Sequence, residues 1–167
     1  SELARIGNKA QTIAKIKKII NIDHHISNNG FTPLHLWNGQ ASSTGELIFR
    51  LGEAMGYPLT PEICTNLYAA ILTDTGGFRY ANTSQDTLWI AAKLVAGGAD
   101  PQWISENIYE SDPPEKIILL KKVMETLSLD LENQVGSLVV TQKALQQANA
   151  SYEHTEGFVD IPRTVKG

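Results

Sequence analysis

The stretch Ile19-Ile20-Asn21-Ile22-Asp23-His24-His25 decides the fold class of this chain. Its first four residues are apolar apart from Asn21, and the run is too short for a helix. Such a run is typical of a buried strand in a parallel sheet. Three polar, titratable residues follow it directly, and open α/β sheets place their chemistry at the carboxyl ends of their strands. The sequence therefore predicts an α/β fold with a site at Asp23, His24 and His25.

The composition limits the classes of function. The chain has 167 residues, of which 42% are hydrophobic and 19% charged, so it can build a core. The net charge of −4 argues against a basic nucleic-acid-binding surface, and an anionic substrate would be held by a few cations or by a metal. No apolar run approaches the ~18 residues of a membrane span, and no signal peptide is visible. With a single cysteine, Cys64, we expect a cytoplasmic protein with no membrane partner.

Helices are predicted on both sides of the strand. Before the strand, a helix is predicted because apolar residues recur at helical spacing at Ile6, Ala10, Ile13 and Ala14. After it, capping and proline patterns predict helix starts at Ser43-Thr44-Gly45-Glu46, Thr60-Pro61-Glu62, Asp100-Pro101 and Asp112-Pro113. The expected apolar faces are Leu47, Ile48, Leu51, Ala54 and Met55 in the first of these and Ile117, Leu120, Met124 and Leu127 in the last. A further helix is predicted to carry Leu88, Ala91, Ala92 and Val95 and to stop at Gly97-Gly98.

The pattern then changes to period two. A β-hairpin is predicted from the alternation of Leu127, Leu129 and Leu131, the turn Glu132-Asn133-Gln134 and the returning run Leu138-Val139-Val140. A short helix over 142–148 follows, and the polar tail from 149 to 167 shows no closing element.

These patterns predict two parts. Residues 1–127 form the main domain, a parallel strand plus several helices, and residues 128–167 form a hairpin, a short helix and a linker toward a second domain. Because a single strand cannot bury a sheet, we expect this chain to be a piece of a longer protein. Exposed strand faces also make a homodimer an expectation.

The Asp23-His24-His25 triplet favours a metal site. Imidazole and carboxylate together suit Mn²⁺, Zn²⁺ or Fe²⁺ better than Ca²⁺. Neighbouring residues at a strand end point in different directions, so one histidine would bind metal and the other substrate. The alternative is a solvated surface pair.

A second signal is Asp74 within Ile71-Leu72-Thr73-Asp74-Thr75-Gly76-Gly77-Phe78-Arg79-Tyr80. An aspartate at the end of a helix is badly placed for the helix dipole, and a divalent metal would offset its charge. Arg79 could bind a phosphate in bidentate fashion. The alternative is a helix C-cap at Gly76-Gly77 with a solvated Asp74 and an Arg79 paired with a surface acid.

Other polar residues give weaker signals. His35 and Trp37 either line a pocket or decorate a loop, and Arg163 and Lys166 in the tail could reach a phosphate or be solvated. Asn82-Thr83-Ser84 matches a glycosylation sequon, which has no meaning in a cytoplasmic chain.

Two stretches together resemble a known family. Asn21-Ile22-Asp23-His24-His25-Ile26-Ser27-Asn28 and the later stretch from Ile71 to Tyr80 resemble, in order, spacing and flanking residues, the third and fourth motifs of the DHH phosphoesterase family. The tail from Thr155 to Gly167 resembles the entry into that family's second, DHH-associated domain. Within the family, the chain most resembles oligoribonucleases that also dephosphorylate 3′-phosphoadenosine 5′-phosphate.

The resemblance implies an enzyme with two Mn²⁺ ions, Mg²⁺ being a possible substitute, that acts on a short nucleotide or oligonucleotide. It implies His24 and Asp74 as metal ligands, and His25 and Asp23 as catalytic residues. His25 would face the substrate phosphate, Asp23 would orient an imidazole, and Arg79 would contact phosphate or support the structure. The metal pair would make a hydroxide nucleophile and stabilise charge on the phosphoryl oxygens.

Other motifs of that family have no counterpart here. Its first motif is missing, the bridging aspartate of its second would precede Ser1-Glu2-Leu3-Ala4-Arg5-Ile6-Gly7, and its Gly-rich substrate motif would follow Gly167. We therefore expect most metal ligands to be missing and the chain by itself to be inactive or nearly so.

Several alternatives stay open. Within the same chemistry they are a cyclic-dinucleotide phosphodiesterase, a RecJ-type exonuclease, and a pyrophosphatase or exopolyphosphatase. The exonuclease would carry a basic groove, which the net charge of −4 does not indicate. From other classes, the alternatives are a non-catalytic module that binds metal or nucleotide, and a helical α/β domain whose histidines are incidental.

Overall fold

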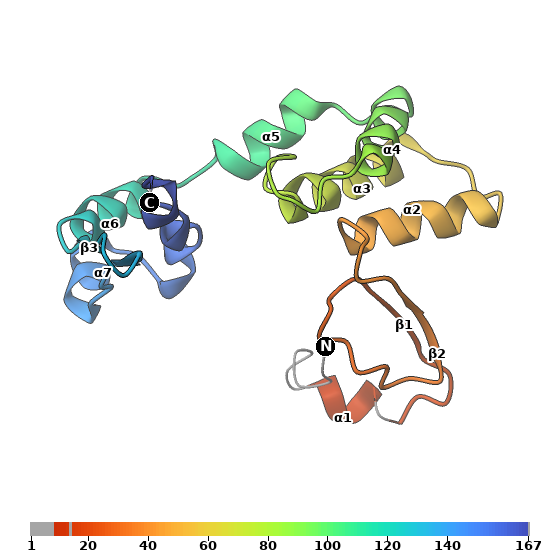
Figure 1. The fold of residues 1–167 in the computed structure, drawn as a ribbon, viewed down its shortest axis with the longest axis horizontal. Coiled ribbons are helices and arrows are strands. Elements are labelled where there is room, and N and C mark those ends of the chain that lie inside the picture. The colour runs from red at the N-terminus through yellow and green to blue at the C-terminus, as the bar shows by residue number, and fades with distance from the viewer. Residues whose placement is uncertain (1–8, 14, 167) are drawn as a thin grey trace. The chain divides into compact units, whose positions relative to one another are not determined.

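The computed structural model describes residues 9–13 and 15–166 (Figure 1). The chain divides into two compact units, Ser1–Glu106 and Asn107–Gly167. The boundary expected from the sequence, after residue 127, falls inside the second unit. The assignment of the chain to two domains stays a prediction.

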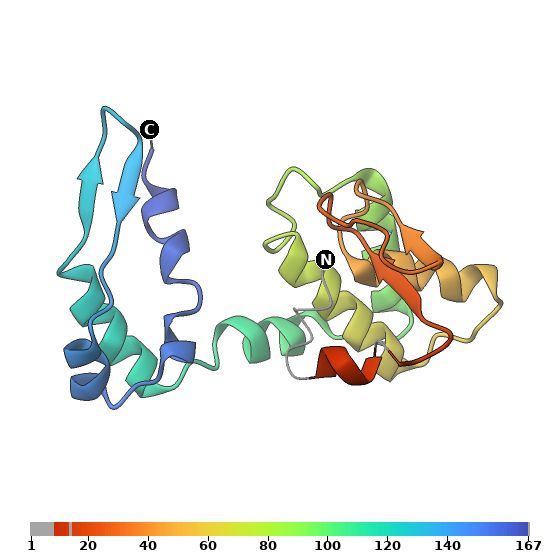
Figure 2. The same ribbon diagram turned by 90° about the horizontal axis from the view of Figure 1, so that it is seen from below.

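The predicted strand is present as β1 (Ile20–Asp23), and it pairs in parallel with a second strand, β2 (Leu34–Trp37) (Figure 2). Asp23 lies opposite Trp37 at the carboxyl end of the pair. The expectation of a buried apolar strand is wrong at Ile20, which is 67% exposed, whereas Asp23 is only 5% exposed. The polar end of β1 is therefore its buried part.

Apart from the helix that carries Leu88, the helices after β1 begin where the capping and proline patterns predict. Upstream of β1, the structure has α1 (Ala10–Ile13), while Ile6 and Ala14 of the expected helix lie outside the described residues. Downstream, the chain continues with α2 (Thr44–Ala54), α3 (Pro61–Asp74), α4 (Gln85–Ala96) and α5 (Pro101–Tyr109). The hydroxyl groups of Ser43, Thr60 and Ser84 cap α2, α3 and α4 by accepting hydrogen bonds from backbone N–H groups.

Helix α2 buries only Leu47 of the expected face, and it buries Phe49 in addition. Leu47 and Phe49 are buried, whereas Ile48, Leu51 and Met55 are exposed. Phe49 packs edge-on against the ring of Trp89, with ring centroids 6.4 Å apart. The neighbouring helix α4 therefore selects which stripe of α2 is buried.

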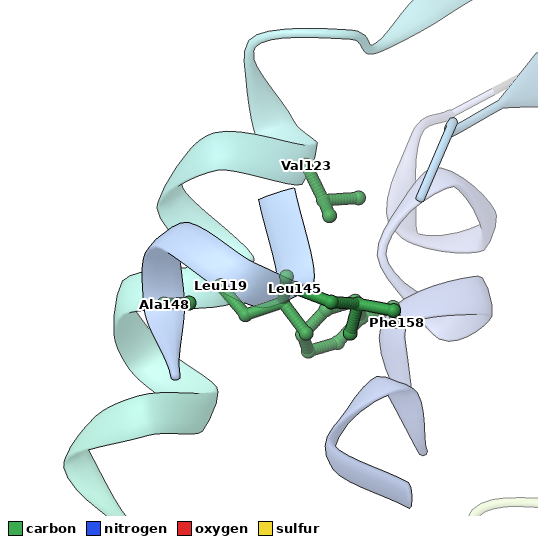
Figure 3. Close-up of a cluster of buried hydrophobic side chains, with 5 residues drawn as sticks. All are labelled: Leu119, Val123, Leu145, Ala148 and Phe158. Atoms are coloured by element: carbon green, nitrogen blue, oxygen red, sulfur yellow. The ribbon is translucent and has the colours of Figure 1, made fainter. Parts of the chain in front are cut away.

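The second unit folds around α6 (Pro114–Met124) and α7 (Gln142–Ala148). Its buried cluster consists of Leu119, Val123, Leu145, Ala148 and Phe158 (Figure 3). Because α6 contributes Leu119 and Val123 to this cluster, it packs with the segments that follow it. The prediction that Ile117 lies on the buried face of α6 is wrong, because its side chain is 54% exposed.

The rest of the second unit is a hairpin and a structured tail. The predicted hairpin is present as β3 (Ser128–Asp130) and β4 (Val135–Ser137), so the chain returns earlier than Leu138-Val139-Val140. The expectation of a tail without a closing element is wrong, because Phe158 enters the buried cluster. The tail forms short 3-10 helices over Tyr152–Thr155, Phe158–Asp160 and Pro162–Thr164.

The length and apolar character of a helix decide whether it could span a membrane. In the part of the chain that the structure describes, no helix combines the length and the apolar character that a membrane span requires. The longest helix of the first unit, α3, runs only from Pro61 to Asp74.

A glycine lets α2 and α3 pack closely. A Cβ atom at Gly45 would lie 2.9 Å from the Cβ atom of Ala70 and 3.3 Å from the carbonyl oxygen of Leu67. Gly52 lies further along the same helix, and a Cβ atom there would meet nothing within 4 Å. The two glycines of α2 therefore offer a matched test of this contact.

We expect Gly45→Ala to lower the free energy of unfolding by about 1–3 kcal/mol, because the added methyl group forces α2 away from α3. Gly52→Ala should instead raise it by about 0.5–1 kcal/mol, since alanine is the better helix former where there is space. Urea denaturation of both variants measures these changes. Equal effects of the two substitutions would show that α2 and α3 do not pack at Gly45.

Candidate functional site

The buried carboxylate of Asp23 organises the end of β1. Its Oδ1 accepts hydrogen bonds from the backbone N–H of His25 at 3.1 Å and from Nδ1 of the same residue at 2.6 Å. The acceptor fixes the proton of the imidazole on Nδ1 and holds the ring in one orientation. The structure thus brings Asp23 and His25 together, and their catalytic roles stay predictions.

Two further residues hold this loop in place: Asn28, which the sequence did not single out, and Trp37, which was predicted either to line a pocket or to decorate a loop. The side-chain amide of Asn28 donates to Oδ2 of Asp23 at 2.7 Å and to Oδ1 of Asn21 at 2.7 Å. The indole Nε1 of Trp37 donates to the carbonyl oxygen of His25 at 2.8 Å. Asn28 lies within the quoted motif, but the contact of Trp37 depends on the pairing of β2 with β1.

A small hollow lies beside this loop. It is lined by Asn28, Asn29, Gly30, His35 and Trp37. Of the two interpretations of His35 and Trp37, the structure therefore favours the pocket over loop decoration.

The two predicted metal ligands meet although they lie far apart in the sequence. Asp74 is the last residue of α3, and its Oδ2 lies 3.3 Å from Nε2 of His24. On the opposite side of the ring, Nδ1 of His24 lies 3.3 Å from the carbonyl oxygen of Ala41. The His24 side chain is only 17% exposed, so it is not a solvated surface group.

The imidazole of His24 therefore has an oxygen atom on each side. A neutral imidazole carries a single N–H, so it can donate to only one of the two oxygens. With the N–H group on Nδ1 facing Ala41, Nε2 would be available as a ligand for a metal ion that Asp74 also reaches. Imidazole nitrogen and carboxylate oxygen are both ligands of Mn²⁺, so His24 and Asp74 fit as two ligands of one ion.

The described residues supply only part of a metal site. Within residues 9–13 and 15–166, no group of three or more histidine, cysteine, aspartate or glutamate side chains is arranged to hold a metal ion. The pair formed by His24 and Asp74 is thus the part of the predicted site that the structure places.

The turn after Asp74 is closed by an unusual run of backbone conformations. Gly76, Gly77 and Phe78 have successive positive φ angles of 57°, 71° and 62°. Oγ1 of Thr75 accepts a hydrogen bond from the backbone N–H of Phe78 at 3.0 Å. Gly76 and Gly77 therefore do end the helix, as the alternative interpretation of this stretch proposes, while Asp74 also contacts His24.

The three cationic residues that were predicted to bind phosphate lie in different parts of the chain. Nε of Arg79 donates to the carbonyl oxygen of Gly76 at 2.6 Å, which ties the side chain to the turn. Arg163 and Lys166 lie in the second unit, where Nη1 of Arg163 is 2.9 Å from Oδ1 of Asp160 and Lys166 is exposed. Phosphate binding by all three stays a prediction.

A buried carboxylate supports the segment that carries Ala41. Oε2 of Glu46 accepts hydrogen bonds from the backbone N–H of Ser42 at 3.0 Å and from its hydroxyl at 2.8 Å. Oε1 accepts from Arg50, whose Nη2 also lies 2.9 Å from Asp86. Burial opposes ionisation of Glu46, but the hydrogen bonds from Ser42 and Arg50 outweigh it and hold its pKa below the ordinary value.

Comparison with known proteins agrees with this geometry. No protein-family model matches the chain. It is 34% identical over 149 residues to the bifunctional oligoribonuclease and PAP phosphatase NrnA of Thermus thermophilus, covering 89% of this chain and 44% of the relative. It is 30% identical over 144 residues to the probable protein of the same name from Streptococcus mutans, covering 86% and 46%.

A solved structure has the same fold. An exopolyphosphatase-related protein from Bacteroides fragilis matches with a TM-score of 0.92 and 27% identity, covering 99% of this chain and 50% of that chain. The fold and the site define an α/β protein that presents histidine and aspartate side chains at the ends of β1 and α3. The chain belongs to the DHH phosphoesterase family. It spans about half the length of the curated relatives that it matches.

We expect Glu46→Gln to lower the free energy of unfolding by about 2 kcal/mol at neutral pH, because the hydrogen bonds to a charged acceptor become neutral ones. Folding lowers the pKa of Glu46 below 4.5, so its ionised form stabilises the fold above that pH. This contribution is lost as the pH falls through the lower pKa of the folded state. Urea denaturation across this pH range should therefore show that the difference in the free energy of unfolding between Glu46→Gln and the wild type becomes smaller in acid.

Glu53→Gln is the matched control on the same helix. Glu53 pairs with Lys93, and both side chains are more than a third exposed, so its loss should cost less than about 1 kcal/mol. A loss for Glu46→Gln no larger than that of the control would contradict a stabilising role of the buried carboxylate.

Proposed function

We propose that this chain carries part of a metal-dependent phosphoesterase site that hydrolyses phosphate esters of short nucleotides. The observation that carries the proposal is the 3.3 Å contact between Nε2 of His24 and Oδ2 of Asp74, which joins the two motifs. The names of the relatives support the same chemistry, since an oligoribonuclease and a PAP phosphatase both cleave phosphate esters.

In this proposal, His24 and Asp74 hold Mn²⁺, with Mg²⁺ as the alternative ion. When bound, a pair of such ions supplies a hydroxide nucleophile near neutral pH and stabilises charge on the phosphoryl oxygens. The described residues provide ligands for part of this pair only. We therefore expect the chain alone to hold at most one ion and to hydrolyse substrate poorly.

His25 is suited to contact the substrate. Its side chain is 47% exposed, and Asp23 occupies only its Nδ1. When the ring is protonated, Nε2 can donate a charge-assisted hydrogen bond to a phosphoryl oxygen. Asp23 would act through His25 by holding the ring in the orientation that this contact needs.

The proposed substrates are short oligoribonucleotides and 3′-phosphoadenosine 5′-phosphate. The names of the relatives from Thermus thermophilus and Streptococcus mutans support them. A net charge of −4 gives little long-range attraction for a long nucleic acid, which favours short substrates. Polyphosphate is the second candidate, because the matching solved structure is that of an exopolyphosphatase-related protein.

Calorimetric titration with Mn²⁺ tests the metal site. We expect His24→Gln and Asp74→Asn each to weaken Mn²⁺ binding about tenfold or more, because each removes one ligand. His154→Gln is the control, since His154 lies in the second unit, where it accepts a hydrogen bond from Ser151. Binding by both site variants that equals that of the wild type would rule out this pair as the metal site.

Product release with Mn²⁺ and with EDTA tests the reaction itself. The panel is 3′-phosphoadenosine 5′-phosphate, a short oligoribonucleotide, a cyclic dinucleotide, pyrophosphate and polyphosphate. We expect release by this chain to be near background and to disappear with EDTA. Strong Mn²⁺-dependent release would overturn the expectation of a partial site, and release that resists EDTA and survives His24→Gln would overturn the proposed function.

A further inference from the structure

One side-chain amide connects the two segments that flank His24. Asn82 lies in the turn between α3 and α4, and its Nδ2 donates to the carbonyl oxygen of Ser42 at 3.0 Å. The same Nδ2 donates to the carbonyl oxygen of Asp74 at 3.1 Å. A primary amide has two N–H groups on one nitrogen, so Asn82 can make both contacts at once.

Each of these segments contributes one acceptor to the imidazole. Ser42 directly follows Ala41, whose carbonyl oxygen lies 3.3 Å from Nδ1 of His24. Asp74 carries the carboxylate that lies 3.3 Å from Nε2 of the same ring. The two hydrogen bonds of Asn82 therefore join the backbone on one side of His24 to the backbone on the other.

The other polar atom of this side chain supports the same interpretation. Within the described residues, Oδ1 of Asn82 is buried and has no hydrogen-bond partner. A buried acceptor without a partner destabilises a fold, so the site retains an amide at a cost in stability. The hydrogen bonds that the amide does make are donated by its nitrogen. A glycan attached to Nδ2 at the sequon Asn82-Thr83-Ser84 would therefore remove one of the two N–H donors.

We propose that Asn82 is a positioning residue, which fixes the separation of His24 and Asp74 through the backbone of Ser42 and Asp74. The consequence for metal binding rests on the proposed function, whereas the effect on the geometry of His24 does not.

The variants Asn82→Ala and Asn82→Leu test the proposal. Leucine is branched at Cγ like asparagine, so it keeps the shape of the side chain while removing both donors. Thr83→Val is the matched control on the same turn, because Oγ1 of Thr83 is also buried without a hydrogen-bond partner in the described part of the chain. It removes a buried polar group that makes no hydrogen bond to either segment in the described part of the chain.

The first measurement is the NMR resonance of the Cε1–H group of His24 in the metal-free full chain, assigned with His24→Gln. We expect both Asn82 variants to move this resonance toward that of a solvent-exposed histidine, and Thr83→Val to leave it in place. No movement in a folded Asn82→Leu protein would overturn the proposal. Equal movement in all three variants would also overturn it, because it would show a general loosening of the turn.

The second measurement is the affinity for Mn²⁺. We expect both Asn82 variants to bind Mn²⁺ about tenfold more weakly than the wild type, a loss typical of residues that orient metal ligands, and Thr83→Val to bind it normally. If the wild-type chain binds no Mn²⁺, the proposed metal site fails, and the NMR measurement still decides the role of Asn82. The two failures are thereby distinguishable.

Discussion

The site depends on one constraint, the placement of the His24 imidazole between two hydrogen-bond acceptors. The carbonyl oxygen of Ala41 lies on one side of the ring and the carboxylate of Asp74 on the other. Because a neutral ring carries a single N–H group, its other nitrogen is free of a proton and can act as a metal ligand. Every contact that fixes the two acceptors therefore affects how well the site can hold a cation.

The structure holds the two acceptors by different physical means. Close packing of α2 on α3 at Gly45 and the hydrogen bonds of Glu46 to Ser42 hold the segment next to Ala41. The end of α3 is held by its own turn, in which Thr75 accepts a hydrogen bond from the chain that folds back. Packing and polar contacts thus act together to hold the two segments in place.

Local signals made much of this predictable from the sequence. Caps, prolines and a strand ending in titratable residues are short-range patterns, so most helix starts could be expected, whereas the pairing of His24 with Asp74 was expected only from the resemblance to the DHH family. Strand β2 (Leu34–Trp37) was missed, because its identity comes from pairing with β1 and its flanks are rich in Gly, Pro and Asn. The buried residue Phe49 was missed because helical spacing allows neighbouring stripes, and only the tertiary partner selects one. The contacts of Asn28 and Trp37 likewise depend on how the loop closes.

Phe158 has a consequence for the order in which this chain acquires its structure during synthesis. It completes the cluster around Leu119 and Leu145, yet it lies in the tail. On the ribosome, helix α6 therefore emerges well before the ring that covers it, and its apolar side chains stay exposed meanwhile. The first unit shows a similar separation, because Phe49 of α2 meets the ring of Trp89 on the later helix α4. Each unit therefore leaves apolar side chains uncovered on the nascent chain until a later segment emerges.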